Sequence, residues 1–305
     1  MYSRRVAGYH LPILPGARAL PKLSVILPAK NEAAALTELL PRLKAAQPSA
    51  EIIVVDDGST DDTATLCASN RVICLSSPYS MGNGAAIKRG TRVATGDILV
   101  FMDGDGQHDP ADIARMLEKL GQGYDLVVGA RDWNSQAGVG RGVANTLYNW
   151  IASRMTGHAV ADLTSGFRAA RADKFREFLY LLPNGFSYPT TSTMAFFRSA
   201  YPVAYLPIKA AQRIGRSHIR PLRDGMRFLL IIFKIATLYS PLKLFVPASV
   251  LFFLLGLANY AWTYMHQGRL TNMSALMWSA SVIVFLIGLV SEQITALTYR
   301  RDEKF

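Results

Sequence analysis

Short apolar segments alternate with amphipathic ones from residue 22 to residue 129, and this alternation limits the folds open to the chain. We expect strands at 22–27, 51–55, 71–75, 98–102 and 125–129. Between the first two, Leu36, Leu39 and Leu43 recur at the spacing of one helix face. Short buried strands that alternate with helices are typical of a mostly parallel sheet with helices on both faces. The pattern therefore predicts a doubly wound α/β fold.

Polar clusters follow three of these predicted strands. They span Pro28 to Glu32, Asp56 to Ser59 and Asp103 to Gln107. In open α/β sheets, ligands bind beyond the carboxyl ends of the strands. Three unrelated acidic turns would have no reason to share this placement, so we expect one ligand site at this edge. We also expect Ser59 or Thr60 to cap the helix that follows the second cluster.

Asp103 and Asp105 come directly after the strand at 98–102, and a glycine follows each of them. Two carboxylates placed in this way can converge on one divalent cation. Mg²⁺ and Mn²⁺ accept such oxygen ligands, and Mg²⁺ usually takes its other ligands from phosphates and water. The alternative is an acidic turn before a helix, because Asp109 and Pro110 suit its N-cap and first position. The other two clusters favour a metal that holds a diphosphate.

Four segments together resemble known motifs. Pro-Ala-Lys-Asn-Glu at 28–32, Val-Asp-Asp-Gly-Ser-Thr-Asp at 55–61 and Asp-Gly-Asp-Gly-Gln-His at 103–108 resemble the ordered motifs of family-2 inverting glycosyltransferases of the GT-A fold. Asp-Leu-Thr-Ser-Gly-Phe-Arg at 162–168 resembles the polyprenyl-phosphate glycosyltransferases, which include dolichol-phosphate mannose synthase and bacterial undecaprenyl-phosphate sugar transferases. The basic segment 212–217 is similar to one in the same group.

The resemblance implies inverting, metal-dependent transfer of a sugar from a GDP- or UDP-sugar to dolichyl or undecaprenyl phosphate. It implies that the nucleotide sugar is bound by Pro28, Lys30, Glu32, Asp56, Asn83 and Asp103. It implies that Mg²⁺ or Mn²⁺ is bound by Asp103, Asp105 and Gln107, with Asp105 also catalytic. Residues implied for the acceptor phosphate or the leaving diphosphate are Arg131, Arg141, Arg213 and Ser217. For Arg131 and Arg141, a solvated loop arginine is an equal alternative.

Two further residues, Asp162 and Arg168, are catalytic candidates by the same resemblance, and Arg168 is also a candidate to bind the acceptor phosphate or the leaving diphosphate. A carboxylate often serves as general base in an inverting transferase. A lipid phosphate with a second pKa of about 6 is already anionic near neutral pH. Asp162 therefore acts either as a base or as a residue that orients Arg168 or the sugar.

One position departs from the usual pattern of the group. The glycine-rich turn carries Asn83 between Gly82 and Gly84, where many relatives have lysine. Lys88 or Arg89 could supply the missing charge, or both could be exposed helix residues. A dinucleotide site is the weaker interpretation of this turn, because the full G-x-G-x-x-G pattern is absent.

The C-terminal part is much more apolar than the rest. Segments 244–265 and 272–297 are long enough to cross a bilayer and are joined by a short connector. Positive charge on both flanks exceeds that of the connector, so we expect a hairpin with the catalytic domain and both termini in the cytoplasm. The segment 220–242 mixes arginines with apolar residues; we interpret it as an interfacial helix, with a core helix as the alternative. Glu292 suggests a snorkelling residue, or contact with a lipid headgroup or a neighbouring subunit.

We therefore expect an irregular arm at 1–21, a catalytic domain at 22–219, the interfacial helix at 220–242, the hairpin at 243–299 and a tail at 300–305. The arm has no apolar core of a signal peptide. The net charge of +11 suits anionic lipid or phosphorylated substrates, whereas no motif favours nucleic acid. We predict an integral protein of a bacterial inner membrane, with lipids and a possible homo-oligomer as partners. The alternatives are a glycolipid or polysaccharide synthase and a non-catalytic membrane interaction protein.

Overall fold

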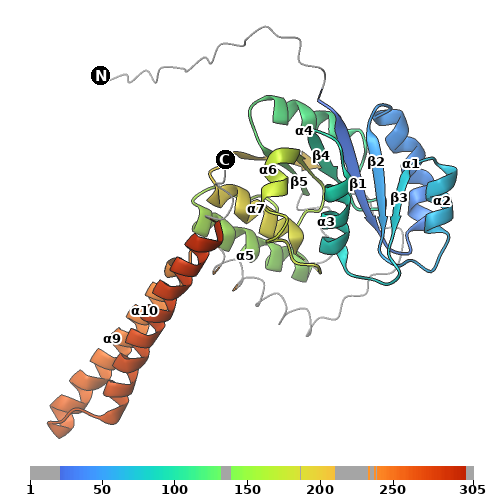
Figure 1. Ribbon diagram of the computed structural model, residues 1–305. Helices are drawn as coiled ribbons and strands as arrows, with labels where there is room; N and C mark the ends of the chain where they lie inside the picture. Colours follow the sequence, from blue (N-terminus) through green and yellow to red (C-terminus); the bar gives the residue numbers. More distant parts are fainter. Residues whose placement is uncertain are drawn as a thin grey trace, which may run out of the picture.

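A computed structural model describes residues 21–131, 139–185, 187–209, 233, 237 and 239–299. An α/β domain is followed by a long helical hairpin that projects away from it (Figure 1). The predicted arm, most of the interfacial helix and the C-terminal tail lie outside the described residues. The α/β domain and the hairpin agree with the predicted fold class.

Seven strands form one sheet in the order β3-β2-β1-β4-β6-β5-β7. They are β1 (Leu23–Ala29), β2 (Glu51–Asp56), β3 (Ile73–Ser76), β4 (Ile98–Phe101), β5 (Leu126–Arg131), β6 (Arg168–Arg171) and β7 (Val203–Ile208). All neighbouring pairs are parallel except the two that involve β6, which runs antiparallel to β4 and to β5. The mostly parallel sheet is therefore confirmed, with one reversed strand inside it, between β4 and β5.

Helices cover both faces of the sheet. They are α1 (Ala33–Ala46), α2 (Thr63–Ser69), α3 (Asn83–Val93), α4 (Asp112–Gly121), α5 (Val139–Thr156), α6 (Ala172–Glu177) and α7 (Tyr188–Arg198). The apolar faces of α1, α2 and α4 share one buried cluster with the sheet. Those of α3, α6 and α7 share the cluster on the opposite face. Burial of apolar side chains on both faces provides the main driving force for this arrangement.

The reversed strand β6 determines which segments meet at the edge of the sheet. Because it runs antiparallel to β4, its first residue lies beside the last residue of that strand, with Arg168 opposite Phe101. The N–H of Gly129 in β5 donates to the carbonyl of Phe167, 2.9 Å away. The segment that precedes β6 therefore lies at the carboxyl ends of β4 and β5.

Two predicted helix starts differ from the structure. Ser59 and Thr60 do not cap α2, which begins at Thr63; there, Asp61 Oδ1 accepts the N–H of Thr63 at 3.1 Å. The helix expected from Pro110 begins at Asp112, because a tight turn comes first, with the Asp112 N–H bonded to the Asp109 carbonyl at 3.1 Å. In both places a side chain or turn just upstream takes up backbone groups before the regular helix forms.

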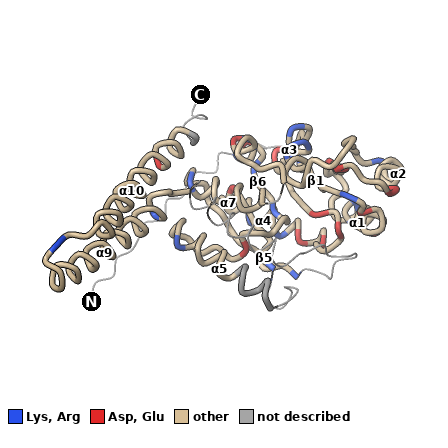
Figure 2. The backbone as a smooth tube through the Cα atoms, turned by 90° about the horizontal axis from the view of Figure 1, so that it is seen from below, with Lys and Arg blue, Asp and Glu red and all other residues tan. Residues whose placement is uncertain are grey.

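The hairpin consists of α9 (Leu242–Gln267) and α10 (Asn272–Tyr299), which agrees closely with the two predicted spans. Ser249 and Ser281 hydrogen-bond across it at 3.2 Å, and Gly256 leaves room for Trp278. Both helices are long and apolar enough to cross a membrane, and only 11% and 17% of their most apolar windows are buried. Charged residues are spread over the α/β domain and are few along the hairpin (Figure 2).

Candidate functional site

The carboxyl ends of β1, β2 and β4 lie together, as the sequence predicts. Ala29 in β1 pairs with Asp56 in β2, and the N–H of Asp57 donates to the Ala29 carbonyl at 2.9 Å. On the other side of β1, the N–H of Gly104 donates to the Pro28 carbonyl at 3.3 Å. A Cβ at Gly104 would lie 3.1 Å from that oxygen, so glycine lets the two backbones approach without displacing either strand end. Backbone contacts thus connect all three polar clusters.

The β1 and β2 loops also hold each other in place. The N–H of Asn31 donates to Ser59 Oγ at 2.9 Å, and Asn31 Oδ1 accepts the N–H of Thr60 at 2.8 Å. Asp56 is buried and accepts the N–H of Ser59 at 2.8 Å. Of the other residues implied for the nucleoside, Lys30 is exposed, and Pro28 and Glu32 are partly buried. The loops therefore form a fixed polar surface at the ends of β1 and β2.

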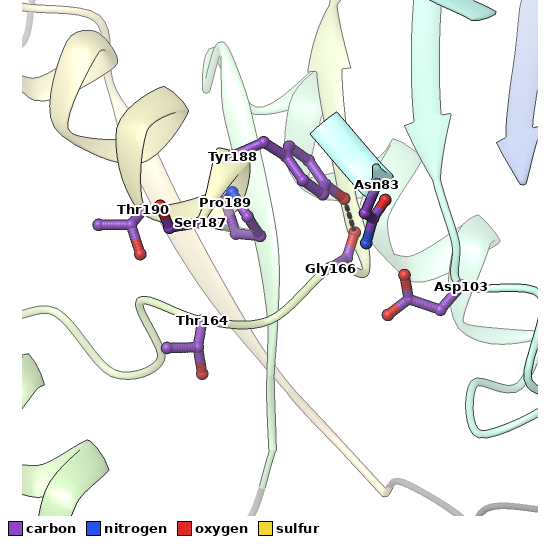
Figure 3. A pocket seen from close by; sticks show the side chains of 8 residues that line it. All are labelled: Asn83, Asp103, Thr164, Gly166, Ser187, Tyr188, Pro189 and Thr190. Atoms are coloured by element: carbon purple, nitrogen blue, oxygen red, sulfur yellow. Dashed lines mark hydrogen bonds between the residues drawn. The ribbon is translucent and has the colours of Figure 1, made fainter. Parts of the chain in front are cut away.

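A pocket opens next to this surface, between the end of β4 and the start of α7 (Figure 3). Its lining residues are Asn83, Asp103, Thr164, Gly166, Ser187, Tyr188, Pro189 and Thr190. The hydroxyl of Tyr188 donates to the Gly166 carbonyl at 3.0 Å, which fixes one wall. Asp103 and Asn83, both named from the sequence, are thus brought together. The described pocket does not include Pro28, Lys30, Glu32 or Asp56 in its lining.

The predicted metal ligands lie on the β4 side of this pocket. A Cβ on Gly166 would lie only 2.6 Å from Oδ2 of Asp103, so any other residue at 166 would displace this carboxylate. Asp105 is buried, and its Oδ1 accepts the N–H of Gln107 at 3.2 Å. Among the residues described, no group of three or more His, Cys, Asp or Glu is arranged around one point. The donor set fits a divalent ion bound by two carboxylates and completed by phosphate and water oxygens.

Asp103 lies in a field of positive charge. Oδ2 of Asp103 is 3.9 Å from Nε2 of His108, which stacks on Phe167. Desolvation raises the pKa of Asp103, but His108 and the guanidinium groups of Arg131 and Arg168 outweigh it, so the pKa lies below its usual value. Asp103 is therefore ionised near neutral pH, as a metal ligand must be.

Arg131 and Asp162 form a paired unit at the end of β5. Nε of Arg131 lies 2.8 Å from Oδ2 of Asp162, and Nη2 of Arg131 lies 2.7 Å from Thr164 Oγ1. Asp162 also accepts the N–H groups of Thr164 and Ser165, at 3.0 and 3.1 Å. Burial raises the pKa of Asp162, but these donors outweigh it and hold the pKa below its usual value. A carboxylate occupied in this way is poorly suited to accept a proton.

The structure also shows which side chain Asp162 orients. The sequence left open whether Asp162 orients Arg168 or the sugar, whereas the structure bonds it to Arg131. Burial lowers the pKa of Arg131, but Asp162, Asp103 and Asp105 outweigh this and raise it. The Arg131 side chain is 27% exposed beside the pocket residue Thr164. It therefore keeps its charge and can contact an anion.

Arg168 lies inside the protein rather than in the pocket. Its Nη1 donates to the Pro189 carbonyl at 2.8 Å and to Ser192 Oγ at 2.7 Å, and its Nη2 donates to the Ser165 carbonyl. Its side chain is fully buried, which lowers its pKa. The guanidinium holds the loop before β6 against the first turn of α7. The expectation that Arg168 binds phosphate directly does not match this placement.

The glycine-rich turn packs against another loop. The N–H groups of Gly84 and Ala85 donate to the carbonyls of Gly185 and Asn184, at 3.1 and 2.8 Å. A Cβ on Gly84 would lie 1.9 Å from the Pro183 carbonyl oxygen, so this approach requires glycine. These amides are therefore not free to cradle a phosphate.

The two cations suggested as substitutes for a lysine at position 83 are also engaged. Lys88 Nζ donates to the carbonyl of Leu182 at 3.2 Å and to Asn184 Oδ1. Arg89 donates to the Ser76 carbonyl and to Ser77 Oγ, both at 2.8 Å. Neither replaces a lysine at position 83 in this structure. Of the remaining residues named from the sequence, the Arg141 side chain, Arg213 and Ser217 lie outside the described part.

The sequence did not single out several residues that shape the site. Asp57 accepts the N–H groups of Met81 and Gly82, at 2.6 and 2.9 Å, and so fastens the glycine-rich turn to β2. Asp57 could have been identified from the sequence, because it is the second of two adjacent acids at the end of a predicted strand. The residues at the start of α7, Ser187 to Thr190, had no such signal, because their place depends on how distant segments pack.

Comparison with known proteins gives two family matches. Residues 24–179 match the family described as glycosyl transferase family 2, and residues 240–297 match the GtrB C-terminal hairpin. The undecaprenyl-phosphate 4-deoxy-4-formamido-L-arabinose transferase of Klebsiella pneumoniae subsp. pneumoniae is 35% identical over 160 residues, 49% of each chain. That of Pseudomonas paraeruginosa is 36% identical over 184 residues, 54% of each chain. The chain thus spans about half the length of the curated relatives it matches.

Similar solved structures include glucosyl-3-phosphoglycerate synthase from Mycobacterium tuberculosis. Its complex with Mn²⁺, uridine diphosphate and glucosyl-3-phosphoglycerate has a TM-score of 0.58 and 22% identity, and covers 75% of this chain and 85% of that one. The complex with phosphoglyceric acid has a TM-score of 0.57, 22% identity and coverage of 71% and 79%. At this level of identity the likeness shows a shared fold.

Proposed function

This chain belongs to glycosyl transferase family 2, and we propose that it transfers one sugar from a GDP- or UDP-sugar to a polyprenyl phosphate. The product is a polyprenyl-phosphate sugar of inverted anomeric configuration. The observation that carries the proposal is the pocket that contains Asp103, bounded by the loop before β6 and by α7. Those two elements connect the polar strand ends to the apolar hairpin. The curated relatives named above also act on undecaprenyl phosphate.

The strand-end loops provide the donor side. The loops at 28–32 and 56–59 present carboxylate and backbone groups that can bind base and ribose. Asp103, Asp105 and Gln107 would hold Mg²⁺ or Mn²⁺, and the fold neighbours include Mn²⁺ complexes. A bound divalent ion stabilises the charge that develops on a departing nucleoside diphosphate. The donor sugar then lies in the pocket beside Asn83 and Gly166.

The loop before β6 provides the acceptor side. An oxygen of the lipid phosphate forms a bond to the anomeric carbon while the bond from that carbon to the diphosphate breaks. The acceptor oxygen already carries negative charge near neutral pH, so no general base is needed. Asp162 serves instead to hold Arg131, whose guanidinium binds the acceptor phosphate or the leaving diphosphate.

The hairpin brings the acceptor to this pocket. We propose that α9 and α10 cross the membrane, with the domain and the hairpin's two flanks on the cytoplasmic side. Trp262 and Tyr264 are 65% and 58% exposed near the far end, where interfacial aromatic residues are expected. Leu147 and Trp150 are exposed on α5, the helix whose C-terminal end bonds to Tyr239 and Lys243 at the start of the hairpin, and they support membrane contact of the domain.

A direct assay tests the proposal. Purified full-length protein in nanodiscs is incubated with labelled UDP- and GDP-sugars and undecaprenyl or dolichyl phosphate, and products are identified by mass. We expect a lipid-linked sugar phosphate that disappears with EDTA and returns with Mg²⁺ or Mn²⁺. Transfer to a glycan or glycolipid instead would favour a polysaccharide or glycolipid synthase. No transfer with any donor would contradict the proposal.

A further inference from the structure

An ion pair joins the α/β domain to the hairpin. Nη2 of Arg198, in the last turn of α7, lies 3.6 Å from Oε1 of Glu292 in α10. Both side chains are mostly buried, with 20% and 24% exposed. Glu292 is the only charged residue of α10, and its Oε2 also accepts the N–H of Leu242 at 3.4 Å. A carboxylate in such an apolar helix is costly unless it is paired, so this partner is significant.

The base of the hairpin, residues 239–244, also bonds to α5 through two hydrogen bonds. Nζ of Lys243 donates to the Met155 carbonyl at 2.6 Å, and the hydroxyl of Tyr239 donates to the Thr156 carbonyl at 3.4 Å. Both acceptors lie at the C-terminal end of α5, where the helix leaves carbonyls without partners in its own backbone. The base of the hairpin is thus held at the ends of two helices of the domain.

Apolar packing continues from the hairpin to the pocket. Tyr239 and Leu244 pack on a buried cluster that includes Leu163 and Met194. Leu163 lies between Asp162 and the pocket residue Thr164, and its carbonyl accepts the hydroxyl of Thr190 at 3.3 Å. The loop before β6 therefore lies on side chains that the hairpin also contacts.

Helix α7 connects the pocket to the ion pair with the hairpin. Its first three residues, Tyr188 to Thr190, line the pocket, and its last residue is Arg198. A helix transmits a displacement along its axis, because its backbone hydrogen bonds resist stretching and bending. A shift of the hairpin at Glu292 would therefore move one wall of the pocket.

We propose that Arg198 and Glu292 are positioning residues that set the pocket at a fixed height and tilt above the membrane. The proposal rests on the proposed function, in which the acceptor is a lipid phosphate whose depth the bilayer determines. With the pair intact, the pocket wall formed by α7 meets that phosphate. With the pair broken, the domain tilts on the hairpin and the lipid acceptor binds less well, while the nucleotide-sugar side is unaffected.

Charge reversal and charge exchange test this proposal. Arg198→Glu and Glu292→Arg are each expected to raise KM for a long-chain polyprenyl phosphate in nanodiscs about fivefold, with kcat and the donor KM unchanged. The exchanged double variant, Arg198→Glu with Glu292→Arg, is expected to restore KM. A short-chain polyprenyl phosphate in solution, which is free to reach the pocket at any height, is expected to show no change in KM in any variant.

A readout without turnover separates this proposal from the proposed function. Hydrogen exchange of α7 amides in nanodiscs is expected to rise about fivefold in the single variants and to return in the double variant. The milder Glu292→Gln replaces a single variant that does not fold. Unchanged exchange in the single variants, or no recovery in the exchanged double variant, would overturn the positioning role even in protein that shows no transfer to any lipid.

The chain offers a matched control. Helix α3 also begins at the pocket, with Asn83, and also carries an arginine, Arg92, in its last turn. Arg92 is exposed, and Figure 1 shows α3 away from the hairpin. Arg92→Glu is expected to change neither KM nor exchange. An effect equal to that of Arg198→Glu would attribute the result to surface charge and overturn the proposal.

Discussion

Two parts of the site use their carboxylates differently. The strand-end part comprises residues 28–32, 56–59 and 103–107, and the helix part comprises 162–166 and 187–190. In the first, the Asp103 side chain is 32% exposed and lines the pocket. In the second, Asp162 is 2% exposed and accepts hydrogen bonds from Arg131, Thr164 and Ser165. The hydrogen-bond donors around each acid thus explain the difference. Asp162 is occupied by protein groups and supports the structure, whereas Asp103 faces the pocket and can bind a ligand.

The largest effect is expected where the carboxylate is open to the ligand. Asp103→Asn should lower the transfer rate by about 1,000-fold, because an amide is a weaker metal ligand and carries no charge. The melting temperature should fall by no more than about 4 °C, because the ion pair that the substitution removes, with His108 at 3.9 Å, is long and the Asp103 side chain is 32% exposed. The matched control is Asp109→Asn in the same loop, an exposed acid that should leave the rate unchanged. Retention of more than a tenth of the activity by Asp103→Asn would remove the metal assignment.

The next largest effect is expected at Arg168, which, unlike Asp103, is a buried charge that stabilises the fold. Arg168→Met should lower the free energy of unfolding by about 3 kcal/mol, because several buried groups lose a hydrogen-bond donor, above all the Ser165 carbonyl. Thermal unfolding in detergent measures this loss. Arg171→Met is the control in the same strand: Arg171 is 45% exposed in its ion pair with Asp125, and less than about 1 kcal/mol is expected. Equal losses would show that burial of Arg168 has no energetic consequence.

The contribution of Asp162 should appear in the pH dependence of the free energy of unfolding. Its folded pKa lies below the ordinary value of about 3.9, so the unfolded chain binds more protons between the two values. Its contribution to stability is therefore present above about pH 4 and is lost as the pH falls through the folded pKa. Asp162→Asn should lower the free energy of unfolding by about 2 kcal/mol at neutral pH and by less at pH 3.

Urea unfolding at several pH values measures this prediction, and the activity of the same variant adds a second test. Loss of the support for Arg131 should reduce transfer about 10- to 100-fold. A loss of 10,000-fold with unchanged stability would instead identify Asp162 as a general base.

The smallest effect is expected at the departure from the usual motif. Asn83→Lys adds one charge to the pocket rim, where position 83 is exposed, and should strengthen UDP or GDP binding about fivefold. Isothermal titration with the nucleoside diphosphate measures it. No change would show that the turn, whose Gly84 and Ala85 amides already bond to residues 184 and 185, lies too far from the diphosphate.

The strand-end part could be predicted from sequence because each of its features lies within one short segment of the chain. Each apolar strand and the polar cluster after it occupy one short segment, and parallel pairing brings the clusters together. The hairpin was equally accessible, since length and hydropathy suffice to identify it.

The helix part could not be predicted in the same way. Arg168 reads as a phosphate ligand in its motif, and only the packing of α7 shows that it is buried. The partner of Asp162 could not be identified among the open alternatives, because Arg131 is 31 residues away and reaches it through the order of β5 and β6. The glycine-rich turn at 82–84 was interpreted through the lysine charge that it lacks, whereas its structure depends on distant partners: the Gly82 amide donates to Asp57, and the Gly84 and Ala85 amides donate to the carbonyls of Gly185 and Asn184.

The reversed strand β6 has a further consequence for how such chains diversify. Its pairing with both β4 and β5 fixes the position of Arg168 and of the loop just before it. Asn149 in α5 adds to this support, since it bonds to the Ala161 carbonyl at 2.7 Å and to the Leu163 N–H at 3.0 Å. Exposed positions of the segment between β5 and the loop can therefore vary while Asp162 stays in line with Arg131. Under the proposed function, this segment can change acceptor recognition while the β1, β2 and β4 loops, which we propose bind the donor, remain unaltered.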